Sequence, residues 1–298
     1  MYPAPMPSDA VAAGSARPAP VRRDGVWILP PLLVLGALFF YPLSLIVGQS
    51  FTLDDGSVSL ATYLAVLGGP LFLGALWHTV EIALGATAGC IGLGFVLALV
   101  LTFVPFPGAR SLARVIDTFI ALPTFLVALA FTFIYGSAGV LNTTLMQMTG
   151  ATTPPVEFLY SPWGVILAEI TVYTPFIMRP LLAAFSLIET AQIEVASSLG
   201  AGAWRIIRQV ILPAAMPALL AGGSLCLLLT VNEFGVVFFI GAKGVITLPL
   251  LIYDKAIQEF DYGTACVIAV ANVVLSLGLY TVYRMVLGRF GGQRAGMV

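Results

Sequence analysis

Long apolar runs alternate with short segments that hold most of the charged residues of this chain. A helix rises about 1.5 Å per residue, so each run is long enough to cross a hydrocarbon core of about 30 Å. The runs are continuous and do not alternate polar with apolar positions, which argues against a membrane β-barrel. The pattern therefore predicts an all-α polytopic membrane protein. Six spans are expected, at about 26–48, 76–104, 112–136, 162–184, 214–241 and 263–287.

The composition supports this fold class. Of the 298 residues, 59% are hydrophobic and only 9% are charged, and the mean hydropathy is +1.02. In a soluble domain roughly a quarter of the residues are charged, so a lipid bilayer must cover much of the surface of this protein. The net charge of −1 gives no indication of a nucleic-acid partner. The three cysteines lie inside apolar runs without the spacing of metal ligands, so we expect no metal site.

The arginines predict the orientation of the spans. All of them lie toward one side of the predicted bundle, whereas Lys243 and Lys255 lie in connections on the opposite side. Positive charge is retained on the cytoplasmic side, so both termini are expected there. The arginines are Arg17, Arg22, Arg23, Arg110, Arg114, Arg179, Arg205, Arg208, Arg284, Arg289 and Arg294.

The chain divides into a transmembrane domain and two tails. Residues 1–25 are rich in Pro, Ala and Ser and predict a disordered cytoplasmic tail. The apolar run that follows is too long for the core of a signal peptide, so we expect it to be retained as the first span. The transmembrane domain is predicted over residues 26–290 and a short tail over 291–298. Outer loops are expected at 137–161 and 242–262, the second with a short helix, re-entrant or interfacial, before the sixth span.

The connection at 186–213 is the longest polar stretch between two apolar runs in the second half of the chain. Small residues surround Glu194, and a helix with such a surface lets another protein come close. Gly200 can take the left-handed conformation that ends a helix. A second short, basic helix is expected to follow, and Pro213 suits the first turn of the next span. The pattern predicts a helix-turn-helix beneath the membrane.

The spacing within this connection resembles the EAA motif of ABC importer permeases, which reads Glu-Ala-Ala, three residues, Gly, nine residues and Ile-x-Leu-Pro. The residues that match in register are Glu194, Ala196, Gly200, Leu212 and Pro213. Val195 and Val210 stand where the motif has alanine and isoleucine. The resemblance extends over about residues 26–290 and includes the six spans, so it implies the type I importer permease fold.

The resemblance also implies a larger assembly in the bacterial inner membrane. In that family two permease subunits, identical or homologous, form the pore, ATP-binding subunits lie below it, and a periplasmic binding protein delivers the solute. The implied ATPase-coupling residues are Glu194, Ala196, Gly200, Arg205, Arg208, Leu212 and Pro213. The chain has no Gly-x-x-x-x-Gly-Lys-Ser/Thr sequence. ATP and Mg are therefore expected on the partner ATPase, and this chain is expected to bind no cofactor and to have no catalytic residue.

Acidic residues inside predicted spans are candidates for the translocation pathway. A buried ionisable group is costly, so Glu81, Glu169 and Glu233 each mark a functional site by default. Each also has a structural alternative, namely a hydrogen bond or an interfacial position. Glu233 is the preferred candidate, and Asn232 is expected to share its polar lining.

Two further predictions concern contacts between neighbouring elements. Asp117 is expected to form a local cytoplasmic ion pair with Arg114. Gly85 and Gly89 form a Gly-x-x-x-Gly sequence in the second span, which indicates a close helix contact.

The region around the end of the fifth span resembles the sulfate, molybdate, iron and phosphonate branch of these permeases. The segments that carry this likeness are 232–235 and 247–253, and the run at 253–262 is similar to 2-aminoethylphosphonate permeases. The resemblance implies 2-aminoethylphosphonate or a related phosphonate as the solute. Permeases for sulfate, molybdate, iron or polyamine remain alternatives. A stand-alone secondary transporter is a further alternative, but it leaves the connection at 186–213 unexplained.

Overall fold

The computed structural model describes residues 27–52, 56–241 and 244–291. These ranges are helical almost throughout, and one isolated antiparallel bridge joins Thr52 to Val58. The α-helices are α1 (Leu29–Leu35), α2 (Tyr41–Ser50), α3 (Ala61–Leu67), α4 (Pro70–Phe103), α5 (Ala109–Thr118), α6 (Thr124–Tyr135), α7 (Val140–Thr149), α8 (Pro162–Phe185), α9 (Thr190–Ser198), α10 (Ala203–Ile206), α11 (Leu212–Val231), α12 (Gly235–Ile240), α13 (Leu248–Tyr253) and α14 (Tyr262–Gly291). The 3-10 and π segments are η2 (Gly36–Phe40), η3 (Phe119–Ala121), η4 (Phe158–Tyr160), η5 (Ile207–Ile211) and η6 (Asp254–Gln258).

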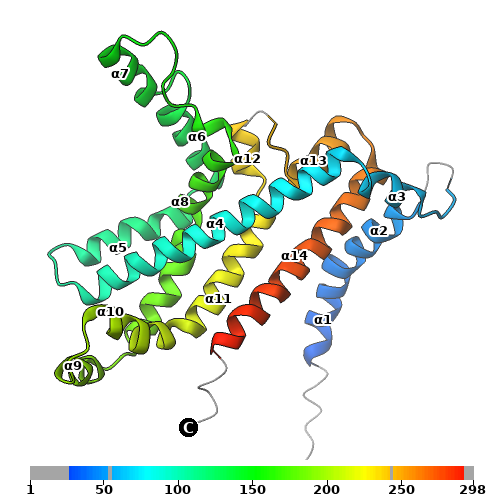
Figure 1. The fold of residues 1–298 in the computed structure, drawn as a ribbon. Helices are drawn as coiled ribbons and strands as arrows, with labels where there is room; N and C mark the ends of the chain where they lie inside the picture. The colour runs from blue at the N-terminus through cyan, green and yellow to red at the C-terminus, as the bar shows by residue number, and fades with distance from the viewer. Residues whose placement is uncertain (1–26, 53–55, 242–243, 292–298) are drawn as a thin grey trace, which may run out of the picture. The chain divides into compact units, whose positions relative to one another are not determined.

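The chain forms two compact units, residues 1–45 and 46–298. In the first unit, the helix α1 has two prolines in its first turn. The N–H groups of a first turn have no hydrogen-bond partner within the helix, so proline, which lacks this group, is tolerated there. The first unit also holds η2 and the start of α2, which continues to Ser50, and the second unit holds all elements from α3 onward (Figure 1). The predicted tail at 1–25, and all but the first residue of the tail at 291–298, lie outside the described residues.

Six helical stretches of the described ranges are long and apolar enough to cross a membrane, which confirms the predicted number of spans. They are Leu29–Ser50, Pro70–Phe103, Thr124–Thr149, Pro162–Phe185, Ala203–Val231 and Tyr262–Arg289. The all-α prediction is confirmed as well, but the bounds predicted for the third and fifth spans are wrong.

The third span is not a helix over 112–136. The chain is interrupted at Leu122, which is extended with ψ of 133°. Proline forces the residue before it out of the helical region, and Pro123 follows directly. The residues before the break form α5, a separate short helix that follows Gly108 with its φ of +94°. The stretch that qualifies as a span therefore begins at Thr124 and continues into α7.

The helix α7 lies in what the sequence predicts to be an outer loop, at 137–161. Its Asn142 is fully buried and fastens the loop. The Asn142 amide donates to the carbonyl oxygens of Gly136 at 2.9 Å and Val156 at 2.7 Å, and its Oδ1 accepts from the N–H of Val156 at 2.9 Å. All three contacts close the loop on itself, so one buried side chain gives this segment a defined structure.

The fifth span does not run to residue 241. The helix α11 ends at Val231, and α12 starts at Gly235 after a break at 232–234. The predicted helix before the sixth span is confirmed as α13, whose first N–H, at Leu248, donates to Thr79 Oγ1 at 2.8 Å.

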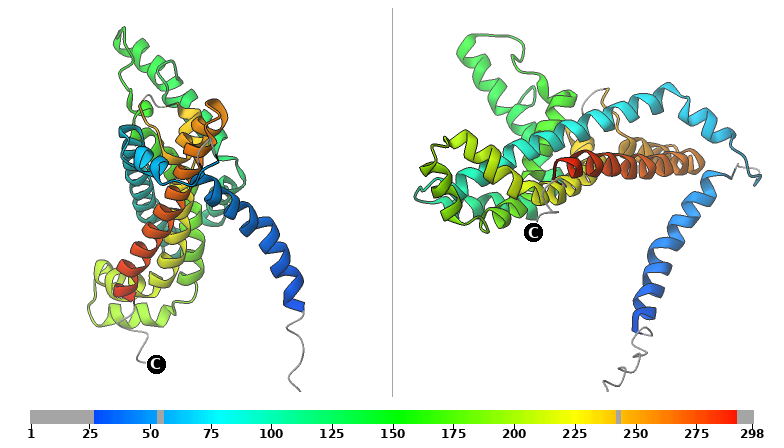
Figure 2. Two further views of the ribbon diagram at one scale, coloured as in Figure 1. Left: turned by 90° about the vertical axis from the view of Figure 1, so that its right-hand side faces the viewer. Right: turned by 60° about the horizontal axis from the view of Figure 1, so that its bottom comes forward.

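The core of the second unit is built by α4, α8 and α11, with α14 alongside α11 (Figures 1 and 2). The predicted close contact through Gly85 and Gly89 is confirmed. A Cβ on Gly85 would lie 2.9 Å from Cδ1 of Ile166, and one on Gly89 would collide with Ile170. Glycine at these positions lets the backbones of α4 and α8 approach closely.

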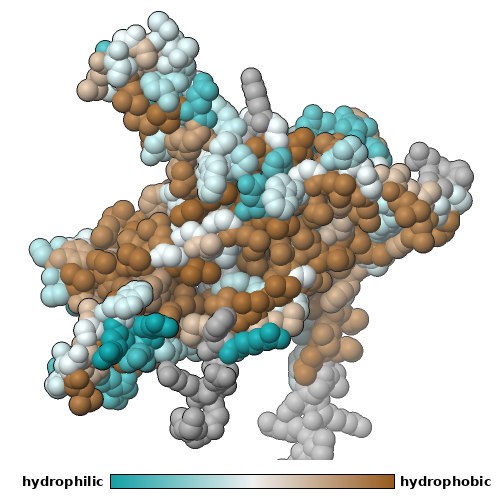
Figure 3. Space-filling view, viewed as in Figure 1, coloured by the Kyte–Doolittle hydropathy of each residue, from teal (hydrophilic) through white to brown (hydrophobic). Residues whose placement is uncertain are grey.

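Charge is divided between the two ends of this unit. Hydrophobic residues cover the long helices, and hydrophilic residues gather around α9 and α10 at one end and around η6 at the other (Figure 3). The arginines of the described part of the unit belong to elements that meet at the α9 end: Arg110, Arg114, Arg179, Arg205, Arg208, Arg284 and Arg289. The opposite end carries Glu157, Asp254, Lys255, Glu259 and Asp261.

Candidate functional site

The connection at 186–213 begins with α9, which a glycine turn ends. Gly200 has a φ of +81°, in the left-handed region, as the sequence predicts. The N–H of Ala201 donates to the carbonyl oxygen of Ala196 at 3.0 Å, and the N–H of Gly200 donates to that of Ser197 at 2.9 Å. These bonds form a Schellman motif. No atom lies within 4 Å of the place a Cβ on Gly200 would take, so only the backbone conformation requires glycine here.

The second helix of the connection is not separate from the fifth span. From Ala203 the helix continues through α10, η5 and α11 to Val231. Pro213 occupies the second position of α11, as predicted, but it does not mark a break. Proline removes one N–H from the helical ladder, and the π segment η5 directly before it is the kind of irregularity that accommodates this loss.

The outer surface of the connection presents large apolar side chains next to charged ones. Leu199 is 82% exposed and Trp204 is 74% exposed. Glu194, Arg205 and Arg208 are exposed too, and within the described part of the chain none of the three forms an ion pair. Exposed Trp and Arg side chains are enriched where proteins bind other proteins. Ala196, Leu212 and Pro213 are half-buried and offer less surface to a partner than the exposed side chains.

The inner side of the connection borders an apolar groove of about 420 Å³, which we name the α4–α10 groove. The last turns of α4 form one wall and the connection forms the other. All lining residues are apolar: Val96, Leu99, Val100, Phe103, Val104, Ile193, Ala203, Ile206, Ile207 and Ile211.

A second candidate site lies at the break in the fifth span, around Glu233. Its side chain is 7% exposed, and both carboxylate oxygens accept hydrogen bonds. Oε1 accepts from Thr124 Oγ1 at 3.1 Å and from the N–H of Val236 at 2.8 Å, and Oε2 accepts from the hydroxyl of Tyr173. The carboxylate thus caps the start of α12 and joins it to the start of α6. The breaks in the third and fifth spans therefore meet at one side chain.

Glu169 lies on α8 one turn before Tyr173 and is fully buried. Neither of its carboxylate oxygens has a hydrogen-bond partner among the described residues. Burying a polar group without a partner is costly, so packing alone does not explain a glutamate at this position. Glu169 remains a candidate for the pathway.

Asn232 belongs to a different polar cluster. Its amide donates to the carbonyl oxygen of Leu228 at 2.8 Å and to Ser276 Oγ at 3.4 Å, and its Oδ1 accepts from Asn272 at 2.9 Å. The side chain of Asn232 is exposed although it lies in the break. Glu81 on α4 is half-buried and makes no side-chain hydrogen bond to a described residue. Glu233 therefore belongs to the cluster with Thr124 and Tyr173, and Asn232 belongs to a separate cluster with Asn272 and Ser276 on α14.

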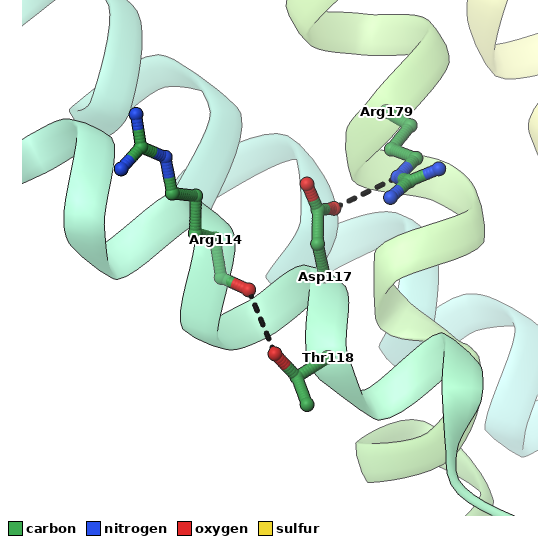
Figure 4. A network of polar contacts seen from close by, with 4 residues as sticks. All are labelled: Arg114, Asp117, Thr118 and Arg179. Atoms are coloured by element: carbon green, nitrogen blue, oxygen red, sulfur yellow. Dashed lines mark hydrogen bonds and ion pairs between the residues drawn. The ribbon is translucent and has the colours of Figure 1, made fainter.

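The predicted pair of Asp117 with Arg114 is wrong. Asp117 Oδ1 instead accepts a hydrogen bond from Nε of Arg179 on α8 at 2.8 Å (Figure 4). The side chain of Arg114 points away from Asp117, and its carbonyl oxygen accepts from Thr118 Oγ1 at 3.0 Å. The ion pair joins α5 to α8 rather than lying within α5.

Sequence reasoning missed the partners of the intramembrane polar residues. Tyr173, a partner of Glu233, follows Glu169 by four residues, so this spacing could have placed Tyr173 on the same polar face of α8 but could not have named Glu233 as its partner. Asn272 and Ser276 show the same spacing on α14. Thr124 has no such signal. Within the described ranges, no group of three or more His, Cys, Asp or Glu residues is placed to hold a metal ion.

Known transport proteins are similar to this chain. Residues 90–291 match the family described as "Binding-protein-dependent transport system inner membrane component". PhnU of Salmonella typhimurium, named as a 2-aminoethylphosphonate transport system permease protein, is 60% identical over 275 residues, which cover 92% of this chain and 96% of PhnU. The cysT protein of Chlorella vulgaris, named as a sulfate transport system permease, is 33% identical over 215 residues, which cover 71% of this chain and 77% of cysT.

Solved structures show the same fold. A chain of a bacterial ABC transporter involved in the import of alginate has a TM-score of 0.77 at 18% identity, covering 90% of this chain and 96% of that one. A chain of the MetNI methionine ABC transporter, in an inward-facing conformation, has a TM-score of 0.52 at 20% identity, covering 74% and 94%. The architecture is thus that of ABC importer permeases.

Proposed function

Because the chain belongs to the family of binding-protein-dependent transport system inner-membrane components, we propose that it is the permease through which an ATP-driven importer carries 2-aminoethylphosphonate or a closely related phosphonate. The protein is a multi-pass inner-membrane permease with the fold of ABC importers. One observation carries the choice of solute, which is the 60% identity to PhnU over nearly the whole of both chains. The sulfate permease cysT is much more distant, at 33% identity.

Separate ATP-binding subunits supply the energy in this proposal. They dock on α9 and the Gly200 turn, and the exposed Leu199 and Trp204 support a protein partner on this surface. The coupling site consists of Glu194, Ala196, Gly200, Arg205, Arg208, Leu212 and Pro213. A second permease subunit, identical or homologous, completes the pore, and a periplasmic binding protein delivers the solute at the end of the bundle opposite α9. Two states that differ in their contacts at the docked surface couple ATP use to transport.

The pathway in this proposal passes the meeting point of the two helix breaks. Non-helical backbone at membrane depth is tolerated where it is buried in protein or lines a cavity. Broken helices hold the solute in many transporters. The breaks at 122–123 and 232–234 meet through Glu233 and Thr124, which supports Glu233 as a pathway residue. Asn232 is a second pathway candidate, because it is polar and exposed within the same break although it bonds a different cluster. Glu169 and Glu81 are further candidates with weaker support.

An uptake experiment tests the solute. Cells that express the chain with its binding protein and ATP-binding subunits should accumulate labelled 2-aminoethylphosphonate. Unlabelled 2-aminoethylphosphonate should compete, whereas sulfate, molybdate, ferric iron and putrescine in equal excess should not. Competition by sulfate with no uptake of the phosphonate would assign the chain to the sulfate branch. Uptake that persists without the ATP-binding subunits would identify a secondary transporter instead.

The proposed orientation places the α9 end in the cytoplasm and η6 in the periplasm. In a variant whose three native cysteines are replaced by serine, Gln258→Cys should react with a membrane-impermeant maleimide in intact cells. Ser198→Cys should react only after the inner membrane is opened. Both side chains are exposed, so a difference between them reports the side of the membrane and not burial. The reverse labelling pattern would contradict the positive-inside argument for this chain.

A further inference from the structure

The α4–α10 groove is open on the surface of the second unit. Val96 and Val104 of its α4 wall are 54% and 50% exposed, so the described chain does not cover that wall. All the residues that line the groove are apolar. Sites for polar solutes place a few polar groups among apolar ones. A wholly apolar lining of this kind fits a hydrocarbon chain and not the transported solute.

The groove lies at the end of a candidate span, where a bilayer would change from hydrocarbon to headgroups. Its α4 wall runs from Val96 to Phe103, the last part of the span, and Val104 follows directly. The other wall begins beside Trp204, which is 74% exposed. Tryptophan concentrates at the membrane–water boundary because its ring is apolar and its N–H is polar. The arginines of the described unit gather at the same end.

The helix that forms the second wall is amphipathic. Ile206, Ile207 and Ile211 line the groove, whereas Arg205 and Arg208, in the same turns, are exposed. Neither arginine forms an ion pair with a described residue. Long basic side chains reach from an apolar surface toward the headgroups. Clusters of basic residues at this depth attract anionic lipids.

We propose that the α4–α10 groove binds an acyl chain of an anionic phospholipid and that Arg205 and Arg208 hold its phosphate. The apolar lining accounts for the acyl chain, and the two arginines, which pair with no acidic residue of the described ranges, account for the choice of headgroup. This role is additional to the proposed coupling role of the two arginines. It would place a bilayer lipid against the connection that joins the permease to its energy source.

The test uses Trp204 as the reporter. In the full-length chain, Trp27, Trp77 and Trp163 are replaced by phenylalanine, and the protein is placed in nanodiscs of phosphatidylcholine. Phosphatidylglycerol with brominated acyl chains, which quench tryptophan on contact, is included at rising mole fractions. We expect brominated phosphatidylglycerol to quench Trp204 at lower mole fractions than brominated phosphatidylcholine. Arg205→Gln and Arg208→Gln should each raise the half-quenching mole fraction by about fivefold, because one basic side chain contributes about 1 kcal/mol to the attraction.

Matched variants separate the groove from its surroundings. Val100→Phe fills the groove and should remove the preference of the quenching for brominated phosphatidylglycerol, whereas Val274→Phe, at an exposed position on α14, should not. Arg284→Gln removes another exposed arginine at the same end and should leave the lipid preference unchanged. Equal quenching by the two lipids, or a preference for phosphatidylglycerol that Val100→Phe does not affect, would overturn the proposal.

One further outcome would replace the lipid with a protein. If phosphatidylglycerol that copurifies with the permease alone is lost when the ATP-binding subunits are bound, a partner protein covers the groove in the assembly and the lipid proposal is wrong. Both leaflets of the nanodisc have the same composition, and no solute is present. Failure of this test therefore leaves the proposed solute and orientation untouched.

Discussion

Gly200→Val should reduce ATP-driven uptake by about 5- to 30-fold while the permease remains in the membrane. Gly200 has a φ of +81°, and the left-handed conformation costs an ordinary residue about 1–2 kcal/mol, which corresponds to that range. A β-branched side chain is particularly unsuited to it. The Schellman bonds at Ala196 and Ser197 would open in most molecules, and α9 would no longer be presented in one orientation. Initial uptake rates, normalised to permease in isolated membranes, measure this effect.

Two substitutions nearby serve as controls for this result. Gly202 also has open space around its Cβ position, but its backbone is extended, with φ of −70° and ψ of 164°. Gly202→Val should therefore keep most of the uptake. Gly200→Asn should also keep most of it, because asparagine tolerates the left-handed region better than other residues. Normal uptake by Gly200→Val would show that the conformation of the turn does not matter for coupling.

Glu233→Leu should destabilise the fold markedly, whereas Glu233→Gln should not. Leucine leaves Tyr173, Thr124 and the N–H of Val236 without an acceptor. Each buried unpaired donor costs about 1–3 kcal/mol, so we expect Tm to fall by on the order of 5 °C or more. Glutamine keeps one carbonyl oxygen for Thr124 and Val236, and the hydroxyl of Tyr173 can accept from its amide. Thermal unfolding of the detergent-solubilised variants distinguishes the two.

The pathway hypothesis adds a prediction for the folded variant. A hydrogen bond to a charged group contributes about 1.5–3 kcal/mol, so loss of the charge in Glu233→Gln should lower uptake by about tenfold or more. Glu259→Gln, which removes an exposed carboxylate beside Lys255, is the matched control and should transport normally. Wild-type uptake by Glu233→Gln at normal protein levels would restrict Glu233 to a structural role.

The length of each apolar run predicts the spans well, because the thickness of the hydrocarbon core sets the length that a spanning helix needs. The predicted end of the second span, 104, lies one residue beyond the observed end at Phe103. Its predicted start, 76, lies six residues after the observed start, because the helix continues to Pro70. Short interruptions are harder to predict. The break at Leu122 could have been read from Pro123, but the one at 232–234 contains no proline and only the fold reveals it.

Contacts that cross the bundle could not be predicted from spacing. Asp117 has Arg114 three residues away on the same helix, which made a local pair the natural expectation. Its actual partner, Arg179, lies 62 residues away. Thr124 and Glu233 are 109 residues apart. A hydrogen bond between two helix breaks depends on how α6, α8 and α12 pack, and a single sequence without pairing information does not contain that arrangement.

The uninterrupted helix from Ala203 to Val231 makes the interior of the bilayer sensitive to small rotations at its margin. Its α11 part alone has 20 residues, or a length of about 30 Å. A tilt of about 5° at the arginine-bearing end would therefore carry the other end sideways by roughly 3 Å over that length. That displacement is comparable to the lengths of the hydrogen bonds that Glu233, two residues after Val231, accepts. A modest swing would thus suffice to exchange the partners of this carboxylate.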